Sequence, residues 1–194
     1  MMPVKLATPR LCLRPFKAAD PGDLTALTDL FADEAVQKYL AVGPMGPKGA
    51  KNFAKTFIRA SDDEWREGGL GVLAVVPLEA VPFEAVADDR ASSIPAPAVI
   101  GYCGLRHLPD RISAVELVYA LAQRHWGQGL ATEAAGAVIN WGFANFDMVE
   151  ILAFTRPEHV ASRRVMEKVE MAFQGETDRY YGETLAVYGR ARAD

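Results

Sequence analysis

Residues 124–133 read Arg-His-Trp-Gly-Gln-Gly-Leu-Ala-Thr-Glu, and they join two runs of different periodicity. An apolar, strand-like run, Val115 to Leu121, precedes them, and a helix-like run, Leu130 to Ala144, follows. A strand that turns through glycines into a helix leaves backbone N–H groups pointing outward at the positive end of the helix dipole. Because glycine has no Cβ, the backbone can approach a phosphate closely. The stretch therefore predicts a pyrophosphate-binding turn, and a glycine-rich turn without a ligand is the alternative.

Two familiar phosphate-binding motifs do not fit this turn. A P-loop requires a Gly-Lys-Ser/Thr sequence, and Gly129 is followed by Leu130 and Ala131 with no lysine. A dinucleotide-binding fingerprint requires a third glycine, and that position is occupied by Thr132. The fingerprint also usually lies in the first strand–helix unit, whereas this turn lies past the middle of the chain. Both classes are therefore disfavoured.

The spacing Arg124-x-x-Gly127-x-Gly129 at a strand–helix junction resembles motif A of the GNAT superfamily of acetyl-CoA-dependent N-acetyltransferases. The wider run from Glu116 to Glu133 is similar to the Rim-type branch, which includes ribosomal-protein N-terminal acetyltransferases and relatives acting on small amines. Other segments match that branch in the same order, namely residues 8–16 with Asp20, 100–105, 157–162 and 167–168. The resemblance covers roughly residues 6–190. It implies an α/β (α+β) fold with a mixed, mostly antiparallel twisted sheet flanked by helices, whose splayed central strands form the acetyl-CoA cleft.

Composition narrows the class of protein. A chain of 194 residues, half of them apolar, predicts a single domain over residues 1–194 with a substantial core. The net charge of −4 argues against a nucleic-acid-binding surface. No apolar run approaches 18 residues and no charged-then-apolar leader is present, so we expect a cytoplasmic protein without a membrane partner. The resemblance to the superfamily is compatible with a monomer or a homodimer.

The cysteines and histidines indicate no metal site and no disulfide framework. Cys12 and Cys103 lie in apolar, strand-like contexts, which is typical of buried thiols. The three histidines are isolated from one another and from carboxylates at ligand spacing.

The rest of the chain alternates strand-like and helix-like segments. Leu11 and Leu13 mark a first strand, Asp20-Pro-Gly-Asp23 predicts a helix start, and residues 42–49 form a loop rich in glycine and proline. A second helix is predicted from about Ala50 to Arg66. The expected later elements are strands at 70–76, 98–105, 115–121, 149–154, 173–175 and 184–188, and a helix at 159–168. Residues 77–97 carry four prolines and are interpreted as a loop insertion.

The resemblance implies which residues hold acetyl-CoA. Backbone N–H groups of the turn would contact the phosphates, and the residues concerned are Gly127, Gln128, Gly129, Leu130, Ala131 and Thr132. The strand end at Leu121 would pair with the pantetheine amides. A backbone N–H near Val118 would face the acetyl oxygen as a preorganised oxyanion donor. Arg124 either contacts a phosphate or caps the turn in solvent.

Two side chains are the leading candidates for proton transfer. Glu116 is a charged residue inside an apolar strand, so it is either a general base or a carboxylate hydrogen-bonded at the rim of the site. Ser162 matches a serine that the Rim-type branch places near the cofactor sulfur, where it would assist departure of the thiolate. Its alternative role is a hydrogen bond to its own helix backbone. Tyr119 is expected to pack beside the cofactor, and Tyr180 and Tyr181 to line the substrate wall.

Two positions depart from the Rim-type pattern. His159 stands where the branch usually has an asparagine that holds the pantetheine arm or a nearby water. A histidine replaces one donor, making His159 a cofactor-binding and catalytic candidate, but one that could titrate near neutrality. Glu170 stands where the family favours glycine, a residue suited to a left-handed helix cap. Either the helix ends differently or the site is altered.

The sequence leaves three functions open. The first is an acetyl-CoA-dependent N-acetyltransferase that transfers the acetyl group directly to a small-molecule or peptide amine. The second is an acyl-CoA-binding sensor that has lost turnover, motivated by His159 and Glu170. The third is an antibiotic-modifying acetyltransferase, for which a strongly acidic acceptor cleft would be favourable.

Overall fold

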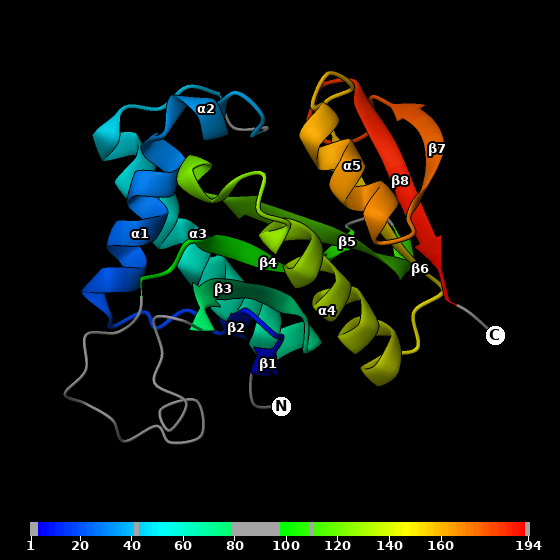
Figure 1. Ribbon diagram of the computed structural model, residues 1–194, viewed down its shortest axis with the longest axis horizontal. Coiled ribbons are helices and arrows are strands. Elements are labelled where there is room, and N and C mark those ends of the chain that lie inside the picture. Colours follow the sequence, from blue (N-terminus) through cyan, green and yellow to red (C-terminus); the bar gives the residue numbers. More distant parts are fainter. Residues whose placement is uncertain (1–3, 41–42, 79–97, 109–110, 193–194) are drawn as a thin grey trace.

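The computed structural model describes residues 4–40, 43–78, 98–108 and 111–192. Within them the strands are β1 (Leu6–Ala7), β2 (Leu11–Arg14), β3 (Gly71–Pro77), β4 (Gly101–Leu108), β5 (Arg111–Leu121), β6 (Glu150–Thr155), β7 (Ala172–Thr177) and β8 (Leu185–Ala191). They form one sheet in the order β1-β2-β3-β4-β5-β6-β8-β7 (Figure 1). Neighbouring strands are antiparallel except β5 and β6, which are parallel. The predicted mixed, mostly antiparallel sheet is confirmed.

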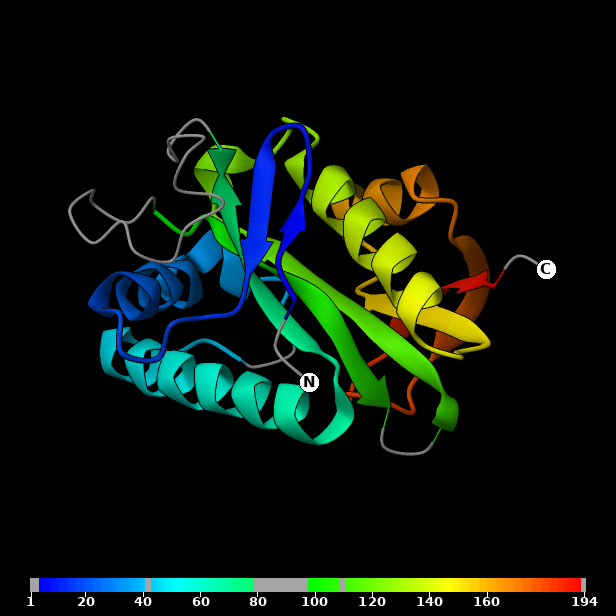
Figure 2. The ribbon, with the colours of Figure 1, turned by 90° about the horizontal axis from the view of Figure 1, so that it is seen from below.

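Five α-helices flank this sheet in the described residues. They are α1 (Pro21–Ala32), α2 (Glu34–Gln37), α3 (Pro47–Gly68), α4 (Leu130–Asn145) and α5 (Val160–Lys168). α4 makes the crossover between β5 and β6, which is why those two strands run parallel. α1 and α3 cover one face of the sheet and α4 covers the other (Figure 2).

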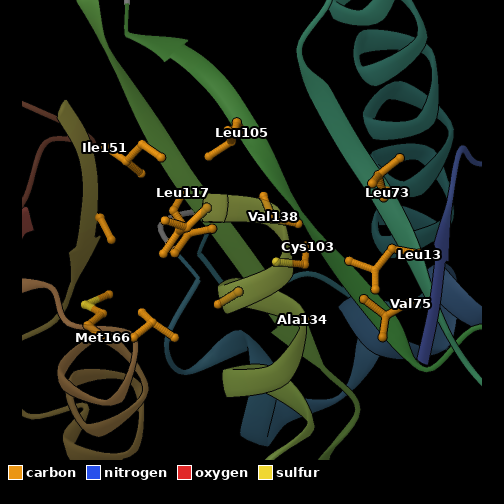
Figure 3. Close-up of a cluster of buried hydrophobic side chains, with 14 of the residues drawn as sticks. Leu13, Leu73, Val75, Cys103, Leu105, Leu117, Ala134, Val138, Ile151 and Met166 are labelled. Atoms are coloured by element: carbon orange, nitrogen blue, oxygen red, sulfur yellow. The ribbon is translucent and has the colours of Figure 1, made fainter. Parts of the chain in front are cut away.

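The two faces of β5 belong to two separate cores. Leu117 and Leu121 pack in the core under α4, where Leu117 lies close to Val138 and Ile151 (Figure 3). Val118 and Ala120 pack against the aromatic core under α1 and α3. Because successive side chains of a strand point to opposite faces, Glu116 faces the α1–α3 side together with Val118. One strand therefore supplies side chains to both sides of the molecule.

The starts of two helices test the predicted boundaries. Asp20 caps α1 by accepting a hydrogen bond from Gly22 N at 2.8 Å, with Pro21 in the first turn, as predicted. α3, however, begins at Pro47 and not near Ala50, so the last part of the predicted 42–49 loop is helical. Proline fits the first turn of a helix because its fixed φ is already helical. It lacks an N–H group, but an N–H at that position would have no partner within the helix. The sequence did not predict this helix start because the glycines of the segment favour a loop.

The end of α5 answers the question raised by Glu170. The helix closes with the Met171 N–H bonded to the Met166 carbonyl at 3.0 Å, and Glu170 adopts a left-handed φ of 62°. This is the cap geometry for which glycine is suited, so the helix does not end differently. The Glu170 carboxylate pairs with Arg190 at 2.9 Å. The departure from glycine is accommodated at the surface, away from β5.

The remaining predictions concern the cysteines, residues 77–97, membrane-spanning helices and metal sites. Cys12 and Cys103 are buried free thiols, as predicted. Of the proposed 77–97 insertion, residues 79–97 lie outside the described part of the chain. Among the described helices, none is both long and apolar enough to cross a membrane. In the same residues, no group of three or more His, Cys, Asp or Glu side chains is arranged to hold a metal ion.

Candidate active site

A cleft of about 550 Å³ opens where β5 and β6 separate. The parallel pairing of these strands covers three residue pairs and stops at Glu116–Leu152. Beyond that point residues 117–121 line the cleft on one side, and Phe154 and Thr155 line it on the other. The splayed central strands that the resemblance implied are therefore present. The first turn of α4 also lines this cleft, as do α3 and α5.

The glycine turn lies at one end of the cleft and presents backbone to it. Gly127 and Gly129 have φ values of 73° and 76°, a left-handed region that favours glycine. Gly129 is the N-cap of α4, and no side chain caps the helix there. A Cβ built on Gly127 would meet nothing within 4 Å. The start of α4 thus has the uncapped N–H groups and open approach that an anion requires.

The predicted turn residues do not all reach the cleft. Gly127, Gly129, Leu130, Ala131 and Thr132 line it. Gln128 and Arg124 are exposed and are not part of that lining. The Gln128 amide donates to the Arg124 carbonyl at 3.1 Å, and Arg124 Nε donates to His125 at 3.1 Å. In this arrangement the two side chains stabilise the turn itself.

Glu133 joins this turn to the N-terminal hairpin, a contact that the sequence did not reveal. Its carboxylate accepts hydrogen bonds from Thr8 Oγ1 at 2.6 Å, Arg10 N at 2.8 Å and Arg10 Nε at 2.6 Å. Arg10 also donates to the Gln128 carbonyl at 2.9 Å. Burial alone would raise the pKa of Glu133, but these hydrogen bonds outweigh it and lower the pKa. Arg10 and Glu133 therefore brace the turn from outside the cleft.

The carbonyl of Leu121 already has a protein partner. The indole N–H of Trp126 donates to it at 2.7 Å, so Trp126 packs around the turn as predicted. Leu121 and Val118 both line the cleft, in the part of β5 that lies beyond its pairing with β6. Their assigned contacts with the cofactor stay predictions.

Glu116 lies at the root of the cleft, at the last pairing of β5 with β6. Only 6% of the residue is exposed, and it lies opposite Arg106 of β4. Tyr181, between β7 and β8, donates a hydrogen bond to its Oε2. Burial raises the pKa of Glu116 to about 6, although the Tyr181 hydrogen bond and the Arg106 charge act in the opposite direction. The group is thus ionised at neutral pH yet readily protonated.

Ser162 and Tyr119 form a hydroxyl pair on the other face of β5. Ser162 lies in the first turn of α5, and its Oγ is 2.8 Å from Tyr119 Oη. In the described part of the chain, the Ser162 hydroxyl bonds to the Tyr119 hydroxyl and not to a carbonyl of its own helix. The Tyr119 hydroxyl also donates to the Ser162 carbonyl at 3.1 Å. Tyr119 was expected only to pack here, so its link to Ser162 is an addition that required the fold.

His159 lies at the start of α5 and stacks on Tyr39. The ring centroids are 3.6 Å apart with an interplanar angle of 6°. Its Nδ1 lies 3.3 Å from Thr155 Oγ1. Burial lowers the pKa of His159 to about 4, and the positive charge of Lys38 adds to that effect while Glu158 opposes it. The ring is therefore neutral at pH 7 and does not titrate near neutrality, contrary to the concern raised by the sequence.

The segment around α2 reaches across the cleft to the α5 side. Besides the Tyr39–His159 stack, Arg156 donates to the Lys38 carbonyl at 2.9 Å and pairs with Glu183 at 2.9 Å. The sequence did not predict α2 because four residues are too short to show helical periodicity. The signal that could have found it is Asp33, which caps the helix by accepting from Ala35 N at 2.9 Å.

Comparisons with known proteins agree with this geometry. The Acetyltransferase (GNAT) domain model matches residues 10–172. The chain is 31% identical to the uncharacterized protein YkkB of Bacillus subtilis (strain 168), covering 96% of this chain and 95% of that protein. It is 25% identical to the uncharacterized N-acetyltransferase p20 of Bacillus licheniformis, covering 94% and 92% respectively. Among solved structures it is similar to RimL, a ribosomal L7/L12 alpha-N-protein acetyltransferase in complex with coenzyme A. That match has a TM-score of 0.72 at 14% identity and covers 97% of this chain and 98% of the other, so the two share a fold.

Proposed function

Because the chain belongs to the GNAT acetyltransferases, as the sequence resemblance indicated, we propose that it transfers an acetyl group directly from acetyl-CoA to a primary amine. The amine would be carried by a peptide N-terminus or by a small molecule. The observation that supports this most strongly is the position of Glu116, a buried carboxylate at the point where the cleft divides β5 from β6. No covalent enzyme intermediate is invoked.

The described residues fit acetyl-CoA, which would supply an acetyl group activated as a thioester. The uncapped start of α4 offers the backbone N–H groups of Gly129, Leu130 and Ala131 to a pyrophosphate. The end of β5 that β6 leaves unpaired, residues 117–121, would offer backbone groups to an extended, amide-containing arm, apart from the Leu121 carbonyl, which Trp126 already holds. Gly127 leaves the approach to the turn open. These features lie along one continuous cleft.

Glu116 is the proposed general base on the acceptor side. With a pKa of about 6 it is mainly a carboxylate at pH 7, and it can accept a proton from the attacking amine. Tyr181 holds the carboxylate in place through its hydrogen bond. An N-terminal amine has a reference pKa of about 7.7–8.0, so part of it is neutral at physiological pH before any base acts. Positioning and a moderate base are then sufficient.

Ser162 and Tyr119 are the proposed proton donors on the opposite side. Their hydroxyls are 2.8 Å apart, and both residues line the cleft. A hydroxyl pair in that position suits protonation of a leaving thiolate. Base and acid would then lie on different faces of β5, so that one strand separates proton removal from proton delivery.

His159 is proposed to act as part of the wall and not as an acid or base. Its neutral ring is committed to the stack on Tyr39 and to Thr155. It would shape the cleft by fixing the segment around α2. The departures at His159 and Glu170 therefore have structural accounts that do not require lost turnover, and the sensor function is the weaker alternative.

Calorimetry with acetyl-CoA, run beside a thiol-release assay with a pool of primary amines and short peptides, tests the proposal. We expect binding, with thiol release that depends on the amine. Binding without release would favour the sensor function. The absence of binding would contradict the assignment of the glycine turn.

A further inference from the structure

We propose that the acceptor is a monoamine whose single amino group is carried on an apolar body of aromatic-ring size. This inference rests on the proposed function, because it identifies the substrate class of the same cleft. The relevant surface is the acceptor pocket, the part of the cleft on the α1–α3 side of β5. It is lined by Val36, Leu40, Phe53, Phe57, Tyr102 and Phe154.

The first support is the aromatic packing of this pocket. Phe57 and Tyr102 lie with ring centroids 4.7 Å apart, and Phe53 packs edge-on against Phe31 at 4.7 Å. These rings come from two helices and a strand, and Phe31, Phe57 and Tyr102 are buried. Such packing makes a preformed, mainly aromatic wall, which favours an apolar ligand body over a hydrophilic one.

The second support is the charge balance of the cleft. Among the described lining residues, the carboxylates are Glu116 and Glu183, and Glu183 is already paired with Arg156 at 2.9 Å. The cations that line the same cleft are Arg106, Arg156, Arg164 and Lys168. A polyamine or aminoglycoside would place several positive charges here, and of these two carboxylates Glu116 is the one that the ion pair with Arg156 does not hold. The strongly acidic cleft that would favour such ligands is not what these residues form.

The third support is the arrangement of the two features. Glu116 lies on the same face of β5 as the residues that pack against the aromatic core. Arg106, its cross-strand neighbour, is held by Glu64 at 2.9 Å and lies over the Phe57 ring at 5.6 Å. An amine at Glu116 would therefore have its body against the aromatic wall. The amine could belong to a free arylalkylamine or to a peptide with an aromatic first residue.

The test is a set of kcat/KM values for four probes with acetyl-CoA. They are phenethylamine, a tripeptide beginning with Phe, the same tripeptide beginning with Ser, and spermidine. We expect phenethylamine or the Phe peptide to exceed both spermidine and the Ser peptide at least tenfold, because a fitted apolar pocket discriminates by about 10–200-fold per apolar group. The better of the first two identifies the source of the amine. Spermidine or the Ser peptide equal to or above both would overturn the inference.

Two variants and a control tie the preference to the pocket. Phe53→Asp and Leu40→Asp place a carboxylate on separate segments of its wall, and each should shift the phenethylamine-to-spermidine ratio toward spermidine at least tenfold. Val149→Asp makes the same charge change at a position that is 64% exposed and outside the cleft lining, and its ratio should equal that of the parent. Equal ratios in all three variants would overturn the inference.

Failure of the proposed function gives a different result. If no amine releases thiol, calorimetry with coenzyme A present measures binding of phenethylamine and spermidine directly. Phenethylamine binding that exceeds spermidine binding would then still support the pocket assignment, and the reverse would overturn it.

Discussion

The two ends of the cleft are built by different means. The glycine turn is made of backbone from consecutive residues, with Gly127 and Gly129 in left-handed conformations before α4. The acceptor pocket and the adjoining Glu116 are made of side chains from α2 and the residues after it, α3, β4, β5 and β6. The first is a site of main-chain dipoles and needs little beyond correct φ and ψ angles. The second depends on the packing and pKa of individual side chains.

The two ends of the cleft therefore differ in which substitutions they tolerate. A backbone site tolerates changes in the surrounding side chains as long as the turn keeps its shape. The side-chain site changes its ligand when one aromatic or acidic residue changes. We therefore expect substitutions at the turn to act on cofactor affinity and substitutions around Glu116 to act on turnover and its pH dependence.

The largest expected effect is that of Glu116→Gln. Loss of a general base typically costs about 10²–10⁴-fold in rate, and we expect kcat to fall within that range with acetyl-CoA affinity unchanged. Burial raises the pKa of Glu116 from 4.5 to about 6, so the ionised group destabilises the fold at pH 7. This cost grows as the pH rises from about 4.5 to about 6 and stays constant above that. The variant should therefore not lose thermal stability at pH 7. A loss of both kcat and Tm would indicate a structural role instead.

The next largest effect is expected at the turn. Gly129→Val places a β-branched residue at a φ of 76°, a strain of about 1–3 kcal/mol that the turn would relieve by changing shape. We expect acetyl-CoA binding, measured by calorimetry, to weaken at least tenfold. Gly175→Val, at a φ of 115° in β7, is the matched control because it is also strained but lies outside the cleft lining. Equal affinities in the two variants would mean that the backbone of the turn does not bind the cofactor.

The difference between the two ends also explains what the sequence could predict. The sequence predicted the glycine turn because its residues are contiguous. It predicted the strands because their apolar residues form recognisable runs. The Glu133–Arg10 brace joins residues 123 positions apart, and the Tyr119–Ser162 pair joins residues 43 positions apart. No local pattern encodes such contacts. Glu116 could be named from its charge in an apolar strand, but its partner Tyr181 required the fold.

A smaller effect should distinguish Tyr181 from Glu116. The Tyr181 hydrogen bond lowers the pKa of Glu116, so Tyr181→Phe should move the acidic limb of the kcat/KM profile to a pH above 6. The rate would fall several-fold near pH 6 and change little near pH 8, where the carboxylate is ionised in both proteins. Tyr180→Phe serves as the control, because that ring packs on Phe154 with centroids 4.8 Å apart. If the acidic limb does not move in Tyr181→Phe, Tyr181 does not tune the pKa of the proposed base.

The smallest effect concerns Glu170, which lies at neither end of the cleft. A non-glycine residue in the left-handed conformation costs about 1–2 kcal/mol, and glycine avoids most of this. Glu170→Gly and Glu170→Gln both remove the ion pair with Arg190, but only the first also relieves the backbone. Chemical denaturation should therefore find Glu170→Gly more stable than Glu170→Gln by about 1 kcal/mol.

Both Glu170 variants should keep the parent rate of acetyl transfer, because the cap of α5 forms in the same place with glutamate as it would with glycine. A large gain in turnover in Glu170→Gly would contradict this. It would mean that the departure from glycine restrains Ser162 through α5, and that the acyl-CoA-binding function describes the parent chain better than catalysis does.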